Sequence, residues 1–275
     1  MHPMLNIGVR AARAAGKILV KNFGVEVDLN VEVKSQNDFV TELDKAAESA
    51  IIRTIQKAYP DHSFLAEESG ELMGKDADHQ WIIDPLDGTT NYLRGIPHFA
   101  ISIAYSYKGQ VQVAVVYDPL REELFTATKG AGAQLNGKRL RVKAQRDLNG
   151  ALLATGFPFK RKDMTKEYLA VFAALFEHVG DMRRNGAAAL DLAYVAAGRI
   201  DGFWEFSLKP WDIAAGQLIV REAGGLVADF AGGHSFMTSG HTVAGNPKVV
   251  QHLLTKARPH LPESLRKKSK DDISC

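Results

Sequence analysis

Apolar residues recur at helical spacing at the start of the chain and again after residue 40. The first stripe predicts an amphipathic helix and consists of Leu5, Val9, Ala12, Gly16 and Leu19. The second predicts a helix of about five turns within residues 40–60 that ends before Pro60. Its stripe consists of Leu43, Ala47, Ala50, Ile51, Thr54 and Ala58. Asp44 falls at the edge of this stripe, so we expect its carboxylate to be half buried and to have a partner.

Strand patterns dominate the next part of the chain. Residues 25–39 alternate like a strand or a hairpin arm. Residues 62–69 and 80–88 are typical of strands that run into polar tips. Apolar residues also alternate along residues 99–142, where KGQ, DPLREE and LNGKR interrupt them, and this pattern predicts a series of hairpins.

Helices and strands alternate in the second half of the chain. The predicted helices span residues 166–180, 186–198 and 211–225, and the predicted strands span residues 150–159 and 199–206. Hairpins followed by alternating elements indicate an α+β half joined to an α/β half. We place these halves at residues 1–145 and 146–261, and we expect residues 262–275 to form a flexible polar tail.

Composition narrows the class of protein. The net charge of +2 gives no overall footprint for nucleic acid, so direct binding of nucleic acid would have to be local. Cys275 is the only cysteine, which excludes an internal disulfide or zinc knuckle and suits a reducing cytosol. Arg10, Arg13 and Lys17 interrupt the first apolar stretch, so no signal peptide is expected there. No apolar run is long enough to span a membrane, and we expect a cytoplasmic protein.

Carboxylates lie at the ends of predicted elements. They are Glu67 and Glu68 after one strand, Asp84 and Asp87 after the next, and Asp212 at the start of a helix. Considered alone, the two aspartates are typical of a turn, the two glutamates of a solvated surface and Asp212 of a helix cap. Considered together, the acids would repel one another unless a cation neutralised them.

Ligands that are all oxygen favour hard cations such as Mg²⁺. Two such ions can activate a water and stabilise the departing oxygen of a phosphate ester. Backbone amides at helix starts bind phosphate, and the candidates are Gly88-Thr89-Thr90 and Asn185-Gly186. The chain has no Walker A loop, no G-x-S-x-G elbow and no metal-ligand spacing among its histidines. The residues by themselves therefore predict Mg²⁺ and a phosphate ester.

Three motifs resemble the inositol monophosphatase family. They are Asp84-Pro-Leu-Asp-Gly-Thr-Thr-Asn91, Trp211-Asp-Ile-Ala-Ala-Gly216 and Glu67-Glu-Ser69, and the resemblance extends over residues 5–255. MHPMLNI, ATGFPF, AALDLAYVAAGRIDGF and REAGG are similar to the bacterial SuhB-type members. The resemblance implies a layered αβαβα sandwich, usually a homodimer. It also implies hydrolysis of phosphate monoesters such as inositol 1-phosphate with Mg²⁺, inhibited by Li⁺.

The resemblance also implies roles for individual residues. The expected ligands are Glu67, Asp84 and the Leu86 carbonyl for one ion, and Asp84, Asp87 and Asp212 for the other. Glu67 and the Thr89 hydroxyl are expected to orient and deprotonate the attacking water, with Asp44 bonded to Thr89. Substrate contacts are expected from Lys34, Asp87, the amides of Gly88 and Thr89, Ala188 and Glu205. The mechanism expected from the resemblance is in-line attack by a metal-activated water, without a covalent enzyme intermediate. Ala66 and Ala187 depart from the Gly and Thr that are common in the family, which bears on sugar specificity.

Two rival functions stay open. Fructose bisphosphatases and phosphoadenosine phosphatases share the acids but need further basic residues for a second phosphate. We regard Arg183-Arg184 as the only paired candidate before the tail, and a solvated or dimer-interface patch is its simpler interpretation. The SuhB-type resemblance implies a second rival: association with Nus antitermination factors, RNA polymerase and ribosomal RNA synthesis. Arg183-Arg184 or the Arg266–Lys270 segment could serve such contacts.

Overall fold

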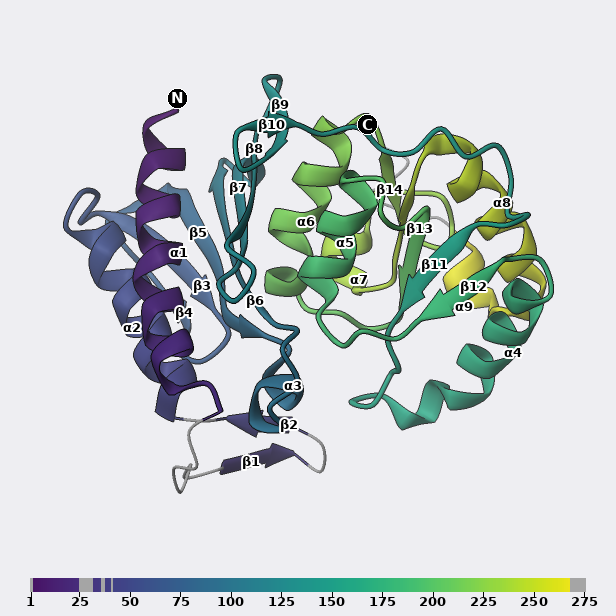
Figure 1. Cartoon of the computed structure of the whole chain (residues 1–275), viewed down its shortest axis with the longest axis horizontal. Coiled ribbons are helices and arrows are strands. Elements are labelled where there is room, and N and C mark those ends of the chain that lie inside the picture. The colour runs from purple at the N-terminus through teal and green to yellow at the C-terminus, as the bar shows by residue number, and fades with distance from the viewer. Residues whose placement is uncertain (1, 25–31, 36–37, 41, 268–275) are drawn as a thin grey trace.

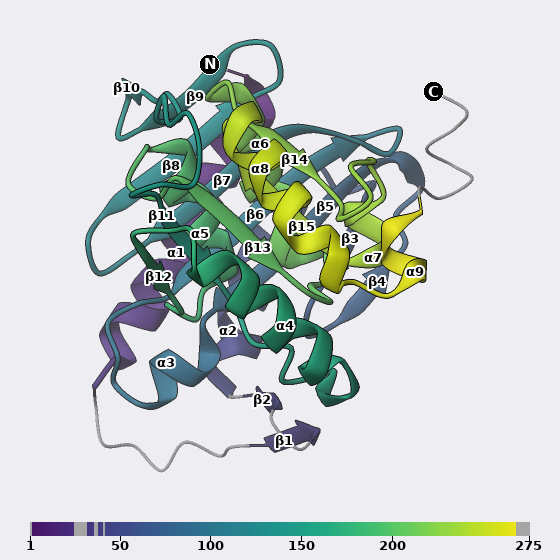
Figure 2. The same cartoon turned by 90° about the vertical axis from the view of Figure 1, so that its right-hand side faces the viewer.

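Five layers of helices and sheets stack on one another in the computed structural model, which describes residues 2–24, 32–35, 38–40 and 42–267 (Figure 1). The outer helices on one side are α1 (Pro3–Asn22) and α2 (Glu42–Gln56). An eight-stranded sheet, a middle layer of α5 (Ala188–Ala196) and α6 (Pro210–Glu222), and a five-stranded sheet follow. The far side is formed by α4 (Thr165–Phe176) and α8 (Pro247–Ala257), which lie in front in the turned view (Figure 2). The αβαβα sandwich is therefore confirmed.

The first sheet is antiparallel except at one edge. Its spatial order is β10 (Lys138–Arg139), β9 (Gly132–Leu135), β8 (Glu123–Thr128), β7 (Gln110–Asp118), β6 (Ala100–Tyr107), β5 (Asp76–Asp87), β3 (His62–Ala66) and β4 (Gly70–Leu72). Only β3 and β5 pair in parallel. The hairpins predicted for residues 99–142 are confirmed as β6 to β9.

The second sheet is mixed. Its order is β12 (Asp181–Arg183), β11 (Leu152–Thr155), β13 (Gly202–Glu205), β15 (Thr242–Gly245) and β14 (Leu226–Ala228). β11 is parallel to both neighbours, whereas β15 is antiparallel to both. The sequence pattern predicted β11 and β13 at greater length, but it did not predict the other three strands. The eight-stranded sheet uses only residues before residue 145 and the five-stranded sheet only residues after it, and the division of the chain at that point stays a prediction.

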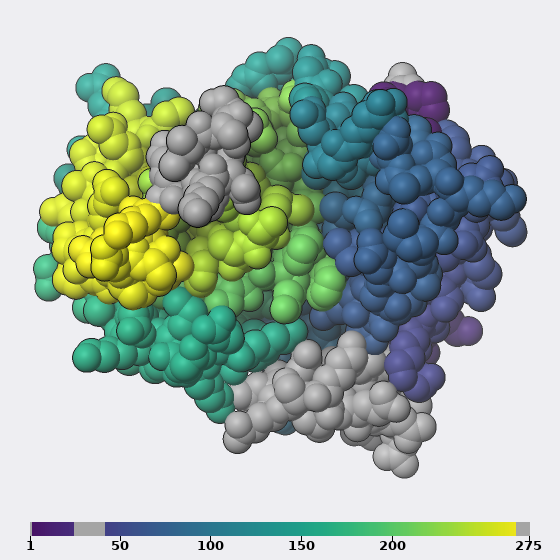
Figure 3. Space-filling view, turned by 180° about the vertical axis from the view of Figure 1, so that it is seen from behind, coloured from purple at the N-terminus to yellow at the C-terminus, as the bar shows by residue number. Residues whose placement is uncertain are grey.

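The remaining elements are short. They are the paired strands β1 (Glu32–Ser35) and β2 (Asp38–Val40), the helices α3 (Thr89–Leu93), α7 (Phe236–Ser239) and α9 (Glu263–Arg266), and the 3₁₀ turns η1 (Lys162–Met164) and η2 (Arg258–His260). Part of residues 25–39 and part of the predicted tail lie outside the described residues. No helix in the described ranges combines the length and apolarity needed to cross a bilayer. Seen from behind, the early residues coloured blue and the last described residues coloured yellow lie on opposite sides of the molecule, with residues coloured green between them (Figure 3).

The buried face of α2 differs from the prediction. Ala58 is exposed because the helix ends at Gln56, whereas Asp44 and Glu48 face inward beside Ile51. Asp44 is 2% exposed rather than half buried. The stripe on α1, by contrast, is buried as predicted, apart from a partly buried Val9 that packs against the same core. Two carboxylates of α2 therefore point into the molecule, and each needs polar partners.

Close packing of α5 against α6 fixes the middle layer. A Cβ atom at Gly216 of α6 would lie 2.5 Å from Leu192 Cδ1 and 2.6 Å from Leu192 Cβ on α5. Gly216→Ala should therefore lower the free energy of unfolding by about 1–3 kcal/mol through overpacking, although Ala for Gly in a helix ordinarily adds about 1 kcal/mol.

Urea unfolding checks this prediction, with Gly8→Ala of α1 as the matched control. The nearest atom to a Cβ at Gly8 is Val115 Cγ2 at 3.3 Å, so we expect a change within about 1 kcal/mol of zero. A Gly216→Ala chain as stable as the native chain would contradict the argument.

Candidate active site

A cavity lies where the end of β5 meets the starts of α5 and α6. It brings together the predicted site residues Glu67, Asp84, Leu86, Asp87, Gly88, Thr89, Ala188, Glu205 and Asp212. Two predicted residues are not placed there. Asp44 is buried on α2 and does not line the cavity, and the side chain of Lys34, in β1, lies outside the described part of the chain.

The end of β5 holds two acids at fixed positions. Asp84 is 1% exposed, and its Oδ1 accepts a hydrogen bond from the Leu86 amide at 2.9 Å. Asp87 Oδ2 accepts from the Ala189 amide on α5 at 2.7 Å. Gly88 follows with φ of 93°, a left-handed conformation that favours glycine, and it lets the chain turn directly into α3. The two acids thus lie in the last residues of β5, on either side of a register irregularity, rather than in a turn, and both are buried.

Glu67 is held beside β5 rather than on a solvated surface. Its amide donates to the Ile83 carbonyl at 3.1 Å. Glu48, buried on α2, accepts from the amides of Glu68 and Ser69 at 2.9 Å each. The sequence interpretation missed Glu48, although it lies one helical turn after Asp44 on the same face.

Asp212 both caps a helix and lines the cavity. It is the third residue of α6, and its Oδ2 accepts from the Lys209 amide at 2.7 Å, as in a capping box. The residue also lines the cavity, so the same carboxylate supports the start of the helix and belongs to the site.

The Thr89 hydroxyl donates to the Leu86 carbonyl at 3.0 Å. A carbonyl oxygen has two lone pairs, so Leu86 can still accept a further partner. Tyr92 of α3 has a pKa raised to about 12, mainly by burial and then by the charge of the Asp44 carboxylate. Asp44 is therefore close to α3. The bond between Asp44 and Thr89 stays a prediction.

Burial and the charges of neighbouring acids raise the pKa of Asp84, Asp87 and Glu205 in the cavity. Desolvation is the main cause for Asp84, followed by the charges of Glu67 and Asp87, and its pKa lies well above the ordinary value. The pKa of Asp87 is raised by desolvation and then by Asp212. The pKa of Glu205 is raised by burial above all. The folded chain thus holds together carboxyl groups that are costly to ionise without a cation.

Asp191 is a buried acid in the cavity that the sequence interpretation missed. It lies on α5 at 1% exposure, and its Oδ1 accepts from Asn185 Nδ2 at 2.6 Å. Burial raises its pKa to about 7, against a smaller opposing effect of the Asn185 bond. A lone acid in the apolar run AAALDLAYVAAG was the available signal.

Basic side chains line the same cavity. They are Lys160, Arg161, Arg184 and Lys209. Arg184 lies over the Phe157 ring at 5.4 Å and opposes the raised pKa of Glu205. Arg183, by contrast, is ion-paired with Asp181 at the surface. The prediction that Arg183-Arg184 is the only paired basic candidate was wrong, because the adjacent Lys160 and Arg161 line the cavity too.

The donor set fits a hard cation. With six carboxyl groups and four basic groups, the cavity lining carries a formal charge of −2 when all are ionised, which repels a dianionic phosphate. Among the described residues, no three His, Cys, Asp or Glu side chains converge to hold a metal ion as they stand. Asp84, Asp87 and Asp212 each accept a hydrogen bond from a backbone amide, and a carboxylate has two oxygens, so the same group can bond an amide and a hard cation.

The fold and the cavity together define a layered αβαβα protein with a carboxylate-rich site at the junction of its two halves. The model of the inositol monophosphatase family matches residues 1–263. The chain belongs to the inositol monophosphatase family.

Individual relatives agree with this assignment. The chain is 59% identical over 267 residues to the Nus factor SuhB of Escherichia coli, covering 97% of this chain and all of the relative. A crystal structure of the extragenic suppressor protein SuhB from Bartonella henselae has a TM-score of 0.92 at 44% identity and covers 94% of this chain and all of that one. The inositol monophosphatase from Anabaena has a TM-score of 0.84 at 38% identity, with 95% and 97% covered.

Proposed function

We propose that the protein is a Mg²⁺-dependent phosphatase of phosphate monoesters, with inositol 1-phosphate as its substrate. The observation that carries the proposal is the set of buried acids Asp84, Asp87 and Glu205. Burial opposes the ionisation of these acids, and a bound cation would offset that cost. Family membership supports the ester chemistry.

Each residue has a proposed role. The ligands would be Glu67, Asp84, the Leu86 carbonyl, Asp87 and Asp212, all oxygen donors on the cavity wall. Bound Mg²⁺ would acidify a water and offset the charge of the phosphate oxygens. Glu67 would accept a proton from the attacking water, and the Thr89 hydroxyl would orient that water.

The substrate would lie in the same cavity, beside the proposed metal ligands. The amides of Gly88 and Thr89 would bind the phosphate, and Asp87, Ala188 and Glu205 would contact the sugar hydroxyls. Asp44 would bond Thr89, and Lys34 would contact the substrate, as the resemblance implies. A homodimer and inhibition by Li⁺ are part of the same proposal. Ala187, which is buried at the start of α5 and lines the cavity, leaves more room there than Thr would.

Phosphate release from inositol 1-phosphate tests the proposal. We expect turnover with Mg²⁺, loss of turnover in EDTA and recovery when Mg²⁺ is restored. Fructose 1,6-bisphosphate serves as the comparison substrate and should be hydrolysed at least about tenfold less efficiently, a difference of about 1.4 kcal/mol in activation free energy. Hydrolysis that persists in EDTA would contradict the proposed role of the cation.

A second candidate function is favoured by the relatives that are named Nus factor SuhB. We propose that the protein also contacts the transcription antitermination machinery, through Nus factors or RNA polymerase. An antitermination reporter in cells separates the two functions. A chain that carries Asp84→Asn should restore antitermination as well as the native chain does if contact alone is required, and should fail if hydrolysis is required.

A further inference from the structure

The two sides of the cavity come from distant parts of the chain. Asp84 and Asp87 lie at the end of β5, whereas Ala188 and Asp212 lie on α5 and α6. A site that binds a cation and an ester needs its groups held within about 0.5 Å of the productive geometry. The bond from the Ala189 amide to Asp87 is one direct link between the sides.

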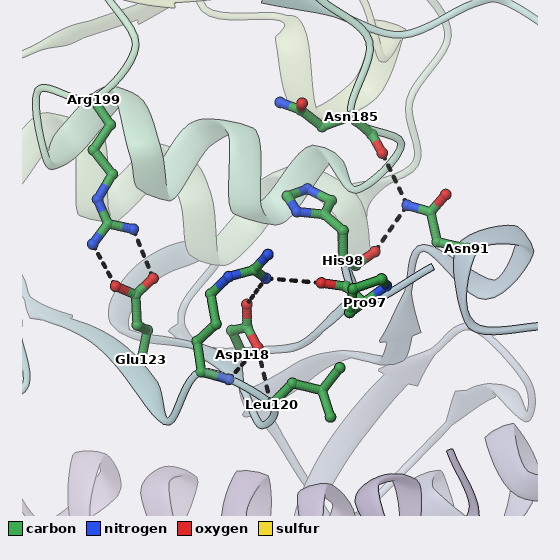
Figure 4. A network of polar contacts seen from close by, with 9 residues as sticks. Asn91, Pro97, His98, Asp118, Leu120, Glu123, Asn185 and Arg199 are labelled. Atoms are coloured by element: carbon green, nitrogen blue, oxygen red, sulfur yellow. Dashed lines mark hydrogen bonds and ion pairs between the residues drawn. The ribbon is translucent and has the colours of Figure 1, made fainter. Parts of the chain in front are cut away.

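Asn91 makes a second, side-chain link at this junction. It lies on α3 at 7% exposure, and its Nδ2 donates to the His98 carbonyl at 2.8 Å and to the Asn185 carbonyl at 2.9 Å (Figure 4). Both amide hydrogens are thereby used. The first bond closes the loop after α3, and the second joins residues that are 94 positions apart.

The two segments held by Asn91 also enclose Gly88. A Cβ atom at Gly88 would lie 3.0 Å from the His98 carbonyl oxygen and 3.3 Å from that of Gly186. The Asn185 side chain continues the link into α5 through its bond to Asp191. Asn91 thus lies at the one place where the corner after β5, the loop after α3 and the start of α5 meet.

We propose that Asn91 is a positioning residue that holds residues 185–189 against the corner formed by Asp87, Gly88 and Thr89. No substrate contact is involved, because Asn91 does not line the cavity and both of its amide hydrogens bond backbone carbonyls. Ala would remove both bonds. Asp would keep the shape but place a carboxylate against two carbonyl oxygens, which repel it. The effect on turnover rests on the proposed phosphatase function, whereas the effect on backbone order does not.

Asn91→Ala and Asn91→Asp test the proposal, with Glu222→Ala as the matched control. Glu222 also joins the two halves by two bonds, since it accepts from the Gly130 and Gly132 amides at 2.7 and 2.8 Å. It lies about 15 Å along α6 from Asp212 and does not line the cavity. Loss of its bonds should loosen the junction without moving the site.

Two readouts decide the matter. Both Asn91 variants should lower kcat for inositol 1-phosphate by about 100-fold with a smaller change in KM, and Glu222→Ala should not. Hydrogen exchange of the amides of residues 185–189 should be at least about tenfold faster in the Asn91 variants only, which corresponds to about 1.4 kcal/mol of lost protection. The proposal would be overturned if either Asn91 variant kept the native kcat and the native exchange rate at residues 185–189. It would also be overturned if Glu222→Ala lowered kcat and raised the exchange rate as much as the Asn91 variants do. If the native chain released no phosphate, the proposed function would fail, and exchange at residues 185–189 would still decide the role of Asn91.

Discussion

Asp84→Asn is expected to lower kcat/KM for inositol 1-phosphate by about 10³-fold or more, which corresponds to about 4 kcal/mol of transition-state stabilisation. Asp84 is the proposed ligand shared by both cations, and at 1% exposure no water can take its place. Asn keeps the shape and the acceptor for the Leu86 amide but removes the charge. Phosphate release at saturating Mg²⁺ measures the loss, and Asp147→Asn, which changes an exposed acid outside the cavity, should retain native activity.

The same variant should show opposite stability effects with and without the cation. In EDTA, Asp84→Asn should unfold at a higher temperature than the native chain, because burial and the charges of Glu67 and Asp87 no longer oppose an ionised group. Mg²⁺ should raise the unfolding temperature of the native chain and change that of the variant much less. Equal stabilisation of both chains by Mg²⁺ would exclude Asp84 as a ligand.

Asp191→Asn is expected to stabilise the chain by about 4 kcal/mol at pH 8 in EDTA. The pKa of Asp191 is about 7 in the folded chain against an ordinary value of 3.8, because the side chain is buried. The folded state therefore binds a proton that the unfolded state has released, and the native chain loses stability as the pH rises from about 4 to about 7. Asn carries no charge and can still accept the bond from Asn185, so the advantage of the variant should be small near pH 4 and complete above pH 7.

Urea unfolding between pH 5 and 8 measures this difference, with Asp118→Asn as a control of opposite sign. Asp118 is buried to a similar degree, but its carboxylate accepts from the amides of Leu120 and Arg121 and from the Arg121 guanidinium (Figure 4). Its replacement should cost about 1–3 kcal/mol at pH 8. A difference between Asp191→Asn and the native chain that did not grow with pH would contradict the assigned burial cost.

Much of the architecture could be predicted from local patterns. The stripe on α1, the hairpins from β6 to β9 and the strand β5 all follow from residues within one or two turns or one strand, because side-chain periodicity reports which face is buried. The acids at the ends of β3 and β5 and at the start of α6 were likewise visible in the sequence. Their repulsion suggested a shared cation, the resemblance assigned them to one site, and the structure places them in one cavity.

Other features depend on how distant segments pack. The positions of Glu48 and Asp191 on their helices gave a signal in the sequence, but only the segments packed against α2 and α5 establish that both acids are buried. Arg183 and Arg184 are neighbours in the chain, yet one pairs with Asp181 and the other faces the cavity. Periodicity specifies a buried face without specifying its partner.

The sequence by itself therefore determined many of the helices and strands, the family and most of the acids of the site. The tertiary structure decided which acids are costly to ionise, because desolvation depends on every segment that packs around them. It also decided that Asn91 joins the two sides of the cavity, because hydrogen-bond partners 94 positions apart become neighbours only when the chain closes.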